Sequence, residues 1–306
     1  MPALRPTWSE LPTGLRTHAA RLLDADAEAV EADSQDGGFT PGAALRILHT
    51  ASGRRLFLKA IPADHPLADA YDREASTIER LPRQGFRPDL IWAGHLDGWT
   101  AMAIADVEGR HPDLSPSSPD IPAVAAAISA MSASLDPSPL DAAPVAVPSG
   151  WRSLTEADLD GTEQAWAIPH LAALADLEDR WAERAASGKA LVHNDIRPDN
   201  LLIRDNGAVV VVDWAQARCG FPWRDTYSLA PHLVMAGHTA ATAENVLAGP
   251  LADADADLVT ANIVALGGYL IRSAPYPAPP NVPHLRPYQA RAARAASALI
   301  RHRTGW

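Results

Sequence analysis

The segment from residue 193 to residue 213 carries the most specific signal in the sequence. It reads His193-Asn194-Asp195-Ile196-Arg197-Pro198-Asp199-Asn200-Leu201-Leu202-Ile203-Arg204-Asp205-Asn206-Gly207-Ala208-Val209-Val210-Val211-Val212-Asp213. An Asn-Gly turn separates its two apolar runs, Leu201–Ile203 and Val209–Val212, and this pattern is a strong signal for a β-hairpin. Such a hairpin holds the residue before its first strand, Asn200, close to the residue after its second strand, Asp213. The polar residues therefore stand at strand ends and in a loop, where functional side chains are usually placed.

The spacing of these polar residues fits the catalytic apparatus of phosphoryl transfer in the kinase fold. Asp195 would accept a hydrogen bond from a substrate hydroxyl and orient it, which is worth on the order of 10²- to 10⁴-fold in rate. Asn200 would bind a metal ion and Asp213 would bridge metal ions to phosphates, because Mg²⁺ needs oxygen ligands. Arg197 and Asp199 have two open roles, contact with substrate or phosphate and a local salt bridge.

One lysine interrupts an otherwise apolar strand over residues 56–61. Only two of the 26 Lys and Arg residues are lysines, so this position stands out. A buried ammonium without an anionic partner costs several kcal/mol. We therefore expect Lys59 to pair with Glu74, fifteen residues later on a predicted helix, while Glu79 fits the spacing less well. The pair would leave Lys59 facing the α- and β-phosphates of a nucleotide.

Periodicity and turn residues predict an α+β fold. The first half alternates strands with a few helices, and the second half is mainly helical. Short connections between the first three strands favour an antiparallel sheet over a βαβ unit. The predicted strands cover residues 27–32, 43–49, 55–61, 89–95 and 99–105, and the predicted helices cover residues 15–23, 67–81, 121–135 and 168–186.

On these motifs the chain resembles the aminoglycoside and macrolide phosphotransferase family, the small-molecule branch of the protein-kinase-like fold. The resemblance runs from the glycine-rich loop at residues 37–42 to Trp306. It implies a bilobal α+β structure, with an N-terminal nucleotide-binding lobe over 1–107 and a larger catalytic and substrate-binding lobe over 108–306. It also implies that Mg²⁺ is a cofactor, that ATP or GTP is the phosphoryl donor, and that a hydroxyl group is the acceptor.

The resemblance assigns a role to individual residues by motif. It makes Asp195 catalytic and Asn200 and Asp213 metal-binding, and it gives structural support of the catalytic loop to His193 and Asp225. The nucleotide-binding residues that it implies are Gly37, Gly38 and Phe39 of the glycine loop, Lys59 with Glu74, and Ile104, Ala105 and Asp106 of a hinge at residues 102–107. The chain departs from the family at Asn194, where glycine is common, and its glycine loop is not a full G-x-G-x-x-G.

Composition excludes several other classes of protein. The formal charge of −11 and the absence of a Lys/Arg-rich block argue against nucleic-acid binding. The longest apolar stretches fall well short of the roughly 20 residues that cross a bilayer. No secretory signal is visible, so we expect a soluble, cytoplasmic protein. A single cysteine, Cys219, cannot form an internal disulfide or a cysteine-rich zinc site.

The substrate stays open at this level. Within the family's range, an antibiotic or related natural product is the best expectation, as a step of resistance or self-protection. The alternatives are a kinase of a primary metabolite such as an amino alcohol or a sugar, and a non-catalytic nucleotide-binding protein of the same fold. A metal-dependent hydrolase with His193, Asp195 and Asp213 as ligands would leave Lys59 and Glu74 unexplained. The choice between ATP and GTP, the acceptor hydroxyl and the oligomeric state are not encoded in any motif.

Overall fold

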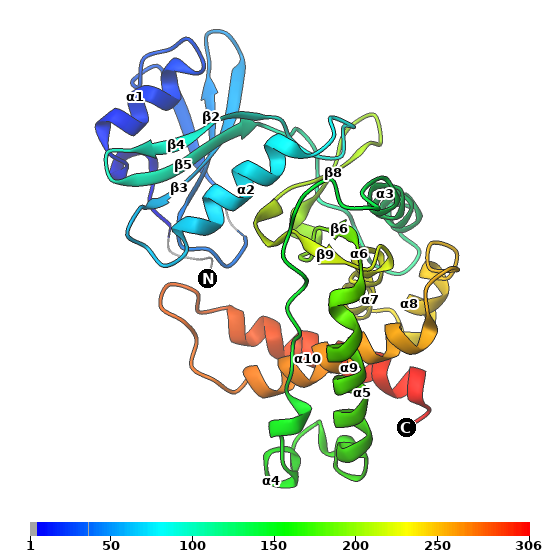
Figure 1. Ribbon diagram of the computed structural model, residues 1–306. Coiled ribbons are helices and arrows are strands. Elements are labelled where there is room, and N and C mark those ends of the chain that lie inside the picture. The colour runs from blue at the N-terminus through cyan, green and yellow to red at the C-terminus, as the bar shows by residue number, and fades with distance from the viewer. Residues whose placement is uncertain (1–4, 36) are drawn as a thin grey trace. The chain divides into compact units, whose positions relative to one another are not determined.

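The computed structural model describes residues 5–35 and 37–306. The chain is α+β, with a five-stranded antiparallel sheet in its N-terminal part and mainly helices in its C-terminal part (Figure 1). This confirms the predicted fold class. The chain divides into two compact units. The first contains the described part of Met1–His111, with Asp199–Gln216 and Pro279–Pro283, and the second contains Pro112–Pro198, Ala217–Ala278 and His284–Trp306. The domain boundary expected at residues 107/108 stays a prediction.

The first unit is built on the sheet, whose strand order is β1-β2-β3-β5-β4 with every neighbouring pair antiparallel. A separate two-stranded antiparallel sheet, β7 with β8, is the hairpin predicted from the Asn-Gly turn. The bounds are α1 Thr13–Arg21, β1 Val30–Ser34, β2 Ala43–His49, β3 Arg54–Pro62, α2 Ala68–Arg80, β4 Leu90–Leu96, β5 Trp99–Ala105, β7 Leu201–Ile203 and β8 Val209–Val211.

Strand alternation gives the sheet two different faces. In β3, Leu56 and Leu58 are completely buried in a core that also contains Leu15 of α1. Phe57 and Lys59 alternate with them and line a pocket. Successive side chains of a strand point to opposite faces, so an apolar strand can bury one set of residues and offer the other set to a ligand. The lysine of β3 is placed by this period of two.

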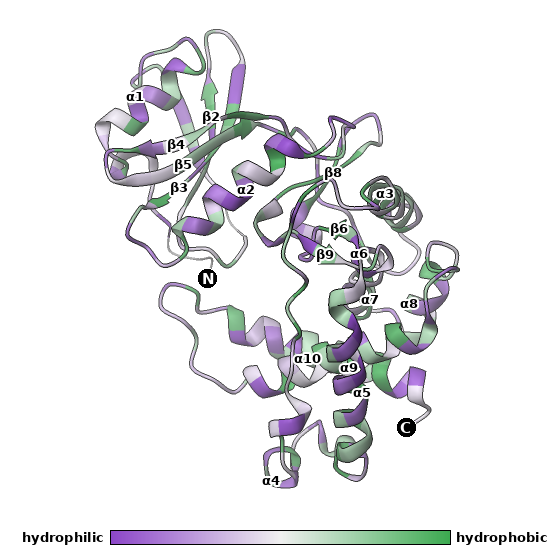
Figure 2. Cartoon of the chain, viewed as in Figure 1, coloured by the Kyte–Doolittle hydropathy of each residue, from purple (hydrophilic) through white to green (hydrophobic). Residues whose placement is uncertain are grey.

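Helix α2 supplies a partner to that second face. Tyr71, Ala75 and Ile78 are buried at helical spacing, and Glu74 is buried among them. The helix carries both hydrophilic and hydrophobic residues along its length (Figure 2). It ends before Pro82, which lacks the N–H that a further helical turn would need.

The second unit is a helical assembly with one short antiparallel pair of strands, β6 with β9. Helices α9 and α10 pack closely because Gly267 leaves room for the side chain of Ile300, whose Cδ1 would lie 2.6 Å from a Cβ at that position. The bounds are α3 Asp120–Ser134, α4 Glu156–Leu159, α5 Leu171–Arg184, β6 Ala190–Val192, β9 Arg218–Gly220, α6 Trp223–Tyr227, α7 Leu229–Met235, α8 Ala240–Leu247, α9 Ala256–Ser273 and α10 Leu285–Thr304.

Two predicted elements begin three residues later than expected. The strand predicted at residues 27–32 starts at Val30, because the N–H of Ala29 donates to the carbonyl of Asp26 and closes a turn. The helix predicted at residues 168–186 becomes α-helical at Leu171, after a 3₁₀ segment that contains Pro169. Within the described residues, no helix combines the length and apolar character that crossing a bilayer requires.

Candidate functional site

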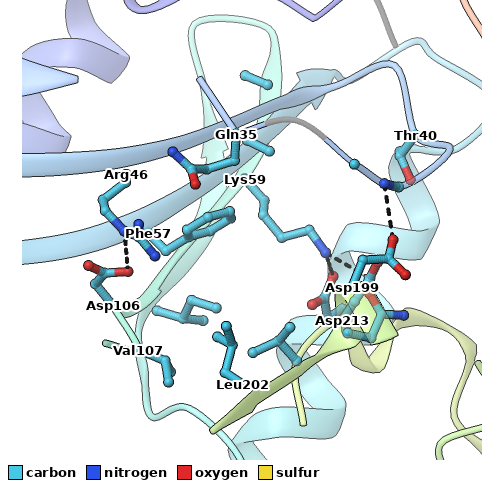
Figure 3. Close-up of a pocket in the computed structure, with 18 of the residues that line it drawn as sticks. Gln35, Thr40, Arg46, Phe57, Lys59, Asp106, Val107, Asp199, Leu202 and Asp213 are labelled. Atoms are coloured by element: carbon cyan, nitrogen blue, oxygen red, sulfur yellow. Dashed lines mark hydrogen bonds and ion pairs between the residues drawn. The ribbon is translucent and has the colours of Figure 1, made fainter. Parts of the chain in front are cut away.

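A pocket in the first unit is lined by the sheet, by the segment before β2, by α2 and by the β7–β8 hairpin (Figure 3). Its empty volume is about 930 Å³, counting space open to solvent. Small-molecule sites usually measure roughly 300–1,000 Å³. Lys59, Asp199 and Asp213 gather at one end of the pocket, and Arg46 and Asp106 lie at the other (Figure 3). We call these the Lys59 end and the Asp106 end.

At the Lys59 end, two carboxylates hold one ammonium. Lys59 Nζ donates to Glu74 Oε2 at 2.5 Å and to Asp213 Oδ1 at 2.8 Å. The Glu74 side chain is 1% exposed and the Lys59 side chain is 13% exposed. The ion pair expected between Lys59 and Glu74 is therefore present, and Asp213 is a second partner that the sequence spacing did not indicate.

Burial and the neighbouring charges control protonation here. Burial raises the pKa of Glu74 to about 7, although the charge of Lys59 opposes this rise. Burial alone would lower the pKa of Lys59, but the carboxylates of Asp213 and Glu74 outweigh it and raise that pKa above its ordinary value. Lys59 is therefore a permanent positive charge at neutral pH.

The β7–β8 hairpin brings Asn200 and Asp213 to the Lys59 end. The N–H of Val212 donates to the carbonyl of Asn200 at 3.0 Å, which holds the two flanks of the hairpin together. Asp213 has a φ of 67°, so the chain turns sharply after β8. Both residues line the pocket. Their amide and carboxylate oxygens are ligands of the kind that Mg²⁺ prefers, so the donor chemistry fits a hard divalent cation.

A glycine turn lies against the same end. Gly37 and Gly38 have φ values of 103° and 68°, in the left-handed region that glycine adopts readily. The N–H of Gly38 donates to Asp199 Oδ2 at 3.3 Å, and the guanidinium of Arg5 donates to the carbonyl of Gly37. Both glycines line the pocket, whereas Phe39, which was predicted with them, is not among its lining residues.

The predicted hinge residues Ile104, Ala105 and Asp106 line the Asp106 end. The N–H of Ala105 donates to the carbonyl of Asp89 at 2.8 Å, so this donor already has a partner in the protein. The Asp106 side chain is 1% exposed, and its Oδ1 accepts from Arg46 Nε at 2.9 Å. A ligand at this end therefore meets an apolar wall next to an ion pair whose carboxylate is buried and whose guanidinium is partly exposed.

The catalytic loop predicted from the sequence belongs to the second unit. The carboxylate of Asp225 is completely buried and accepts the N–H groups of His193 at 2.6 Å and of Asn194 at 2.9 Å. The N–H of Asp195 donates to His193 Nδ1 at 3.3 Å. Burial raises the pKa of Asp225, and the two backbone hydrogen bonds act against that rise. These contacts fix the backbone of His193 and Asn194, the two residues before Asp195.

The departure from the family at Asn194 has a local explanation. Asn194 has a φ of 67°, a left-handed conformation that suits glycine and that asparagine tolerates better than most residues. Arg224 donates to Asn194 Oδ1, so the side chain is also anchored. The conformation of this position therefore accommodates an asparagine.

The structure separates the predicted site residues into two groups. Asp195, His193 and Asp225 form the hydrogen-bonded loop of the second unit. The remaining predicted residues belong to the first unit, where all except Phe39 line one pocket. Sequence reasoning missed Arg5, Arg46 and Phe57, which also line it. Alternation along the strand could have identified Phe57, since it lies two residues before Lys59, but no local pattern marks Arg5.

No group of three or more His, Cys, Asp and Glu side chains within residues 5–35 and 37–306 is placed to hold a metal ion.

A sequence profile of the phosphotransferase enzyme family (APH) matches residues 42–258. No curated protein matches the chain.

Several solved structures share the fold. A thermostable mutant of aminoglycoside phosphotransferase APH(4)-Ia, in a ternary complex with AMP-PNP and hygromycin B, is 18% identical with a TM-score of 0.56, and the match covers 93% of this chain and 98% of that one. Spectinomycin phosphotransferase APH(9)-Ia, in complex with ADP and spectinomycin, is 10% identical with a TM-score of 0.53 and coverages of 89% and 92%. A putative fructosamine-3-kinase from Haemophilus somnus 129PT is 9% identical with a TM-score of 0.53 and coverages of 94% and 96%. At these identities the likeness concerns the fold alone.

Proposed function

Because this chain belongs to the phosphotransferase enzyme family, we propose that it is an ATP- or GTP-dependent kinase that transfers the γ-phosphoryl group to a hydroxyl of a small molecule. One observation carries the proposal. Lys59 lies between Glu74 and Asp213 at the end of a pocket that Asn200 also lines. A permanent cation next to oxygen ligands suits a metal-bound triphosphate.

The two ends of the pocket divide the nucleotide between them. The α- and β-phosphates would lie at the Lys59 end, where the ammonium is oriented by Glu74. The base would lie at the Asp106 end against Phe57, whose aromatic ring offers a flat apolar surface. Backbone groups of the hinge residues Ile104 and Asp106 would bind the base edge.

Asn200 and Asp213 would hold Mg²⁺ on the phosphate oxygens. One amide and one carboxylate leave most of the coordination to phosphate and water oxygens, which is how Mg²⁺ is commonly bound at phosphoryl-transfer sites. When bound, the metal neutralises charge on the transferring group. Asp213 would also keep its hydrogen bond to Lys59, which ties the metal site to the phosphate-binding cation.

Asp195 would accept the proton of the acceptor hydroxyl. The hydroxyl oxygen then forms a bond to the γ-phosphorus while the bond to the β–γ bridging oxygen breaks, and the nucleoside diphosphate leaves. Asp225 would keep the loop in place through its bonds to the backbone of His193 and Asn194.

For the acceptor, we propose an antibiotic or a related natural product. Support comes from the structurally similar phosphotransferases that hold hygromycin B and spectinomycin. The second candidate is a primary metabolite, because the fold is as close to that of a putative fructosamine-3-kinase as to that of the spectinomycin phosphotransferase, each with a TM-score of 0.53. A non-catalytic nucleotide-binding role is the third candidate, and the complete set of Lys59, Asp195, Asn200 and Asp213 disfavours it.

A panel assay tests the proposal. The protein is incubated with Mg²⁺, ATP or GTP and individual hydroxyl-bearing compounds that include aminoglycosides, macrolides, spectinomycin, amino alcohols and sugar amines. We expect one class to gain roughly 80 daltons, the mass of one phosphoryl group. A gain on a sugar amine or amino alcohol alone would favour the second candidate. Nucleotide binding without a gain on any compound would favour the third.

A further inference from the structure

Arg5 lies at the Lys59 end of the pocket, ahead of α1 in the sequence. It lines the pocket together with Gly37 and Gly38, and its guanidinium donates to the carbonyl of Gly37. A Cβ added to Gly38 would lie 3.0 Å from Arg5 Nη2, so the guanidinium packs directly against the turn. Burial raises the pKa of Tyr71, and the charge of Arg5 is one of those that oppose this rise. Arg5 therefore acts on the same cluster of groups as Lys59.

The charges at this end explain what a second cation would do. Three carboxylates, those of Glu74, Asp199 and Asp213, line the pocket here, and Lys59 is shared between two of them. A triphosphate adds further negative charge to a place where carboxylates already outnumber the ammonium. An arginine reduces that repulsion, and its planar fork of N–H donors matches phosphate oxygens better than a point charge does.

We propose that Arg5 binds the triphosphate together with Lys59 and holds the Gly37–Gly38 turn over it. The proposal rests on the proposed function, because it assumes a nucleoside triphosphate in this pocket. Arg5 and both glycines lie outside residues 42–258, which the family profile matches. Arg5 and the turn would therefore extend the nucleotide site beyond the region that the profile matches.

Calorimetry in the presence of Mg²⁺ tests the proposal by measuring the binding of ATP, ADP and adenosine. The same measurements are made with GTP, GDP and guanosine. Arg5→Ala is compared with Arg5→Lys, and with Arg83→Ala as a control that removes an exposed arginine of the same unit outside the pocket. Thermal unfolding of each variant is measured alongside. We expect Arg5→Ala to weaken triphosphate binding roughly 10- to 100-fold, as loss of a charge-assisted hydrogen bond does. The diphosphate should lose less and the nucleoside nothing.

Arg5→Lys should recover part of the triphosphate affinity, because it keeps the charge but not the fork. If Arg5→Ala bound the triphosphate as tightly as Arg83→Ala does, the assignment of Arg5 would be overturned. The proposed function would still stand. An equal loss for triphosphate and nucleoside would also overturn it, since Arg5 would then support only the shape of the pocket. Failure of the unmodified protein to bind any nucleotide would overturn both proposals.

Discussion

Lys59 Nζ lies 2.8 Å from Asp213 Oδ1, although 154 residues separate the two in the sequence. Lys59 comes from β3 and Asp213 from the turn after β8, so the large sheet and the hairpin meet at one end of a single pocket. This hydrogen bond joins two motifs that the sequence presents separately. It also means that the cation and one proposed metal ligand cannot be changed independently.

Replacing Lys59 with methionine tests what the ammonium contributes to stability and to triphosphate binding. Without the ammonium, Glu74 is left as a buried carboxyl with no cation. Breaking a buried ion pair from one side typically costs about 3–5 kcal/mol. We expect urea unfolding to show a loss at the lower end of that range, because Glu74 can take up a proton near neutral pH. Triphosphate binding should weaken at least about tenfold.

Lys189→Met is the matched control, since Lys189 is the only other lysine and is exposed. Lys189→Met should leave the free energy of unfolding and the triphosphate affinity unchanged. If Lys59→Met behaved like Lys189→Met, the pairing seen in the structure would have no energetic weight and the nucleotide assignment would lose its main support.

Replacing Asp195 with asparagine separates chemistry from binding. Asparagine keeps the size of the side chain but cannot accept the hydroxyl proton. Transfer to the acceptor should fall by about 10²- to 10⁴-fold, while nucleotide affinity stays within about twofold of the unmodified protein. Asp205→Asn, in the exposed hairpin turn, serves as the control. A parallel loss of transfer and nucleotide binding would show that Asp195 supports the fold and not the reaction.

Asp225 should act as a positioning residue. In Asp225→Asn, one of the two carboxylate oxygens that accept backbone N–H groups becomes a donor, so one of those hydrogen bonds is lost. We expect a stability loss of about 1–3 kcal/mol and a lower kcat, with an unchanged KM for the nucleotide. Steady-state kinetics over a range of nucleotide concentrations distinguishes the two parameters. A raised KM with normal kcat would contradict the bracing role.

The titration of Glu74 should make the protein less stable as pH rises. Its pKa of about 7 in the folded protein exceeds the ordinary value of 4.5, so the folded chain keeps a proton that the unfolded chain has lost between these values. The free energy of unfolding should therefore fall as pH rises through this window, by up to about 3 kcal/mol. Glu74→Gln should lack this contribution. Urea unfolding of both proteins at about pH 5 and about pH 8 measures it, and parallel curves would show that Glu74 titrates normally.

Much of this site follows from local physical rules. The Asn-Gly turn predicted the hairpin, and the cost of burying a charge predicted the pair of Lys59 with Glu74. Both are present in the structure. Strands β2 and β5 were also predicted with their observed bounds, since the apolar runs end at clear turns. The family resemblance was carried by the same motifs and is confirmed.

Other features depend on contacts that no local pattern encodes. The bond between Lys59 and Asp213 depends on how the hairpin packs against the sheet, and Arg5 is a single arginine in a segment without periodicity. Phe39 follows two glycines of the turn, and sequence spacing alone cannot tell whether its side chain enters the pocket. The roles given to the site residues and the domain boundary at residues 107/108 stay predictions.

A crystal structure of the protein with Mg²⁺ and a non-hydrolysable triphosphate, AMP-PNP or GMP-PNP, would show whether Lys59, Asn200 and Asp213 together hold a metal-bound triphosphate. We expect phosphate oxygens within hydrogen-bond distance of Lys59 Nζ. We also expect a magnesium ion about 2.0–2.1 Å from oxygens of Asn200 and Asp213. Phosphates bound away from Lys59, or a metal that contacts neither Asn200 nor Asp213, would rule out this nucleotide site.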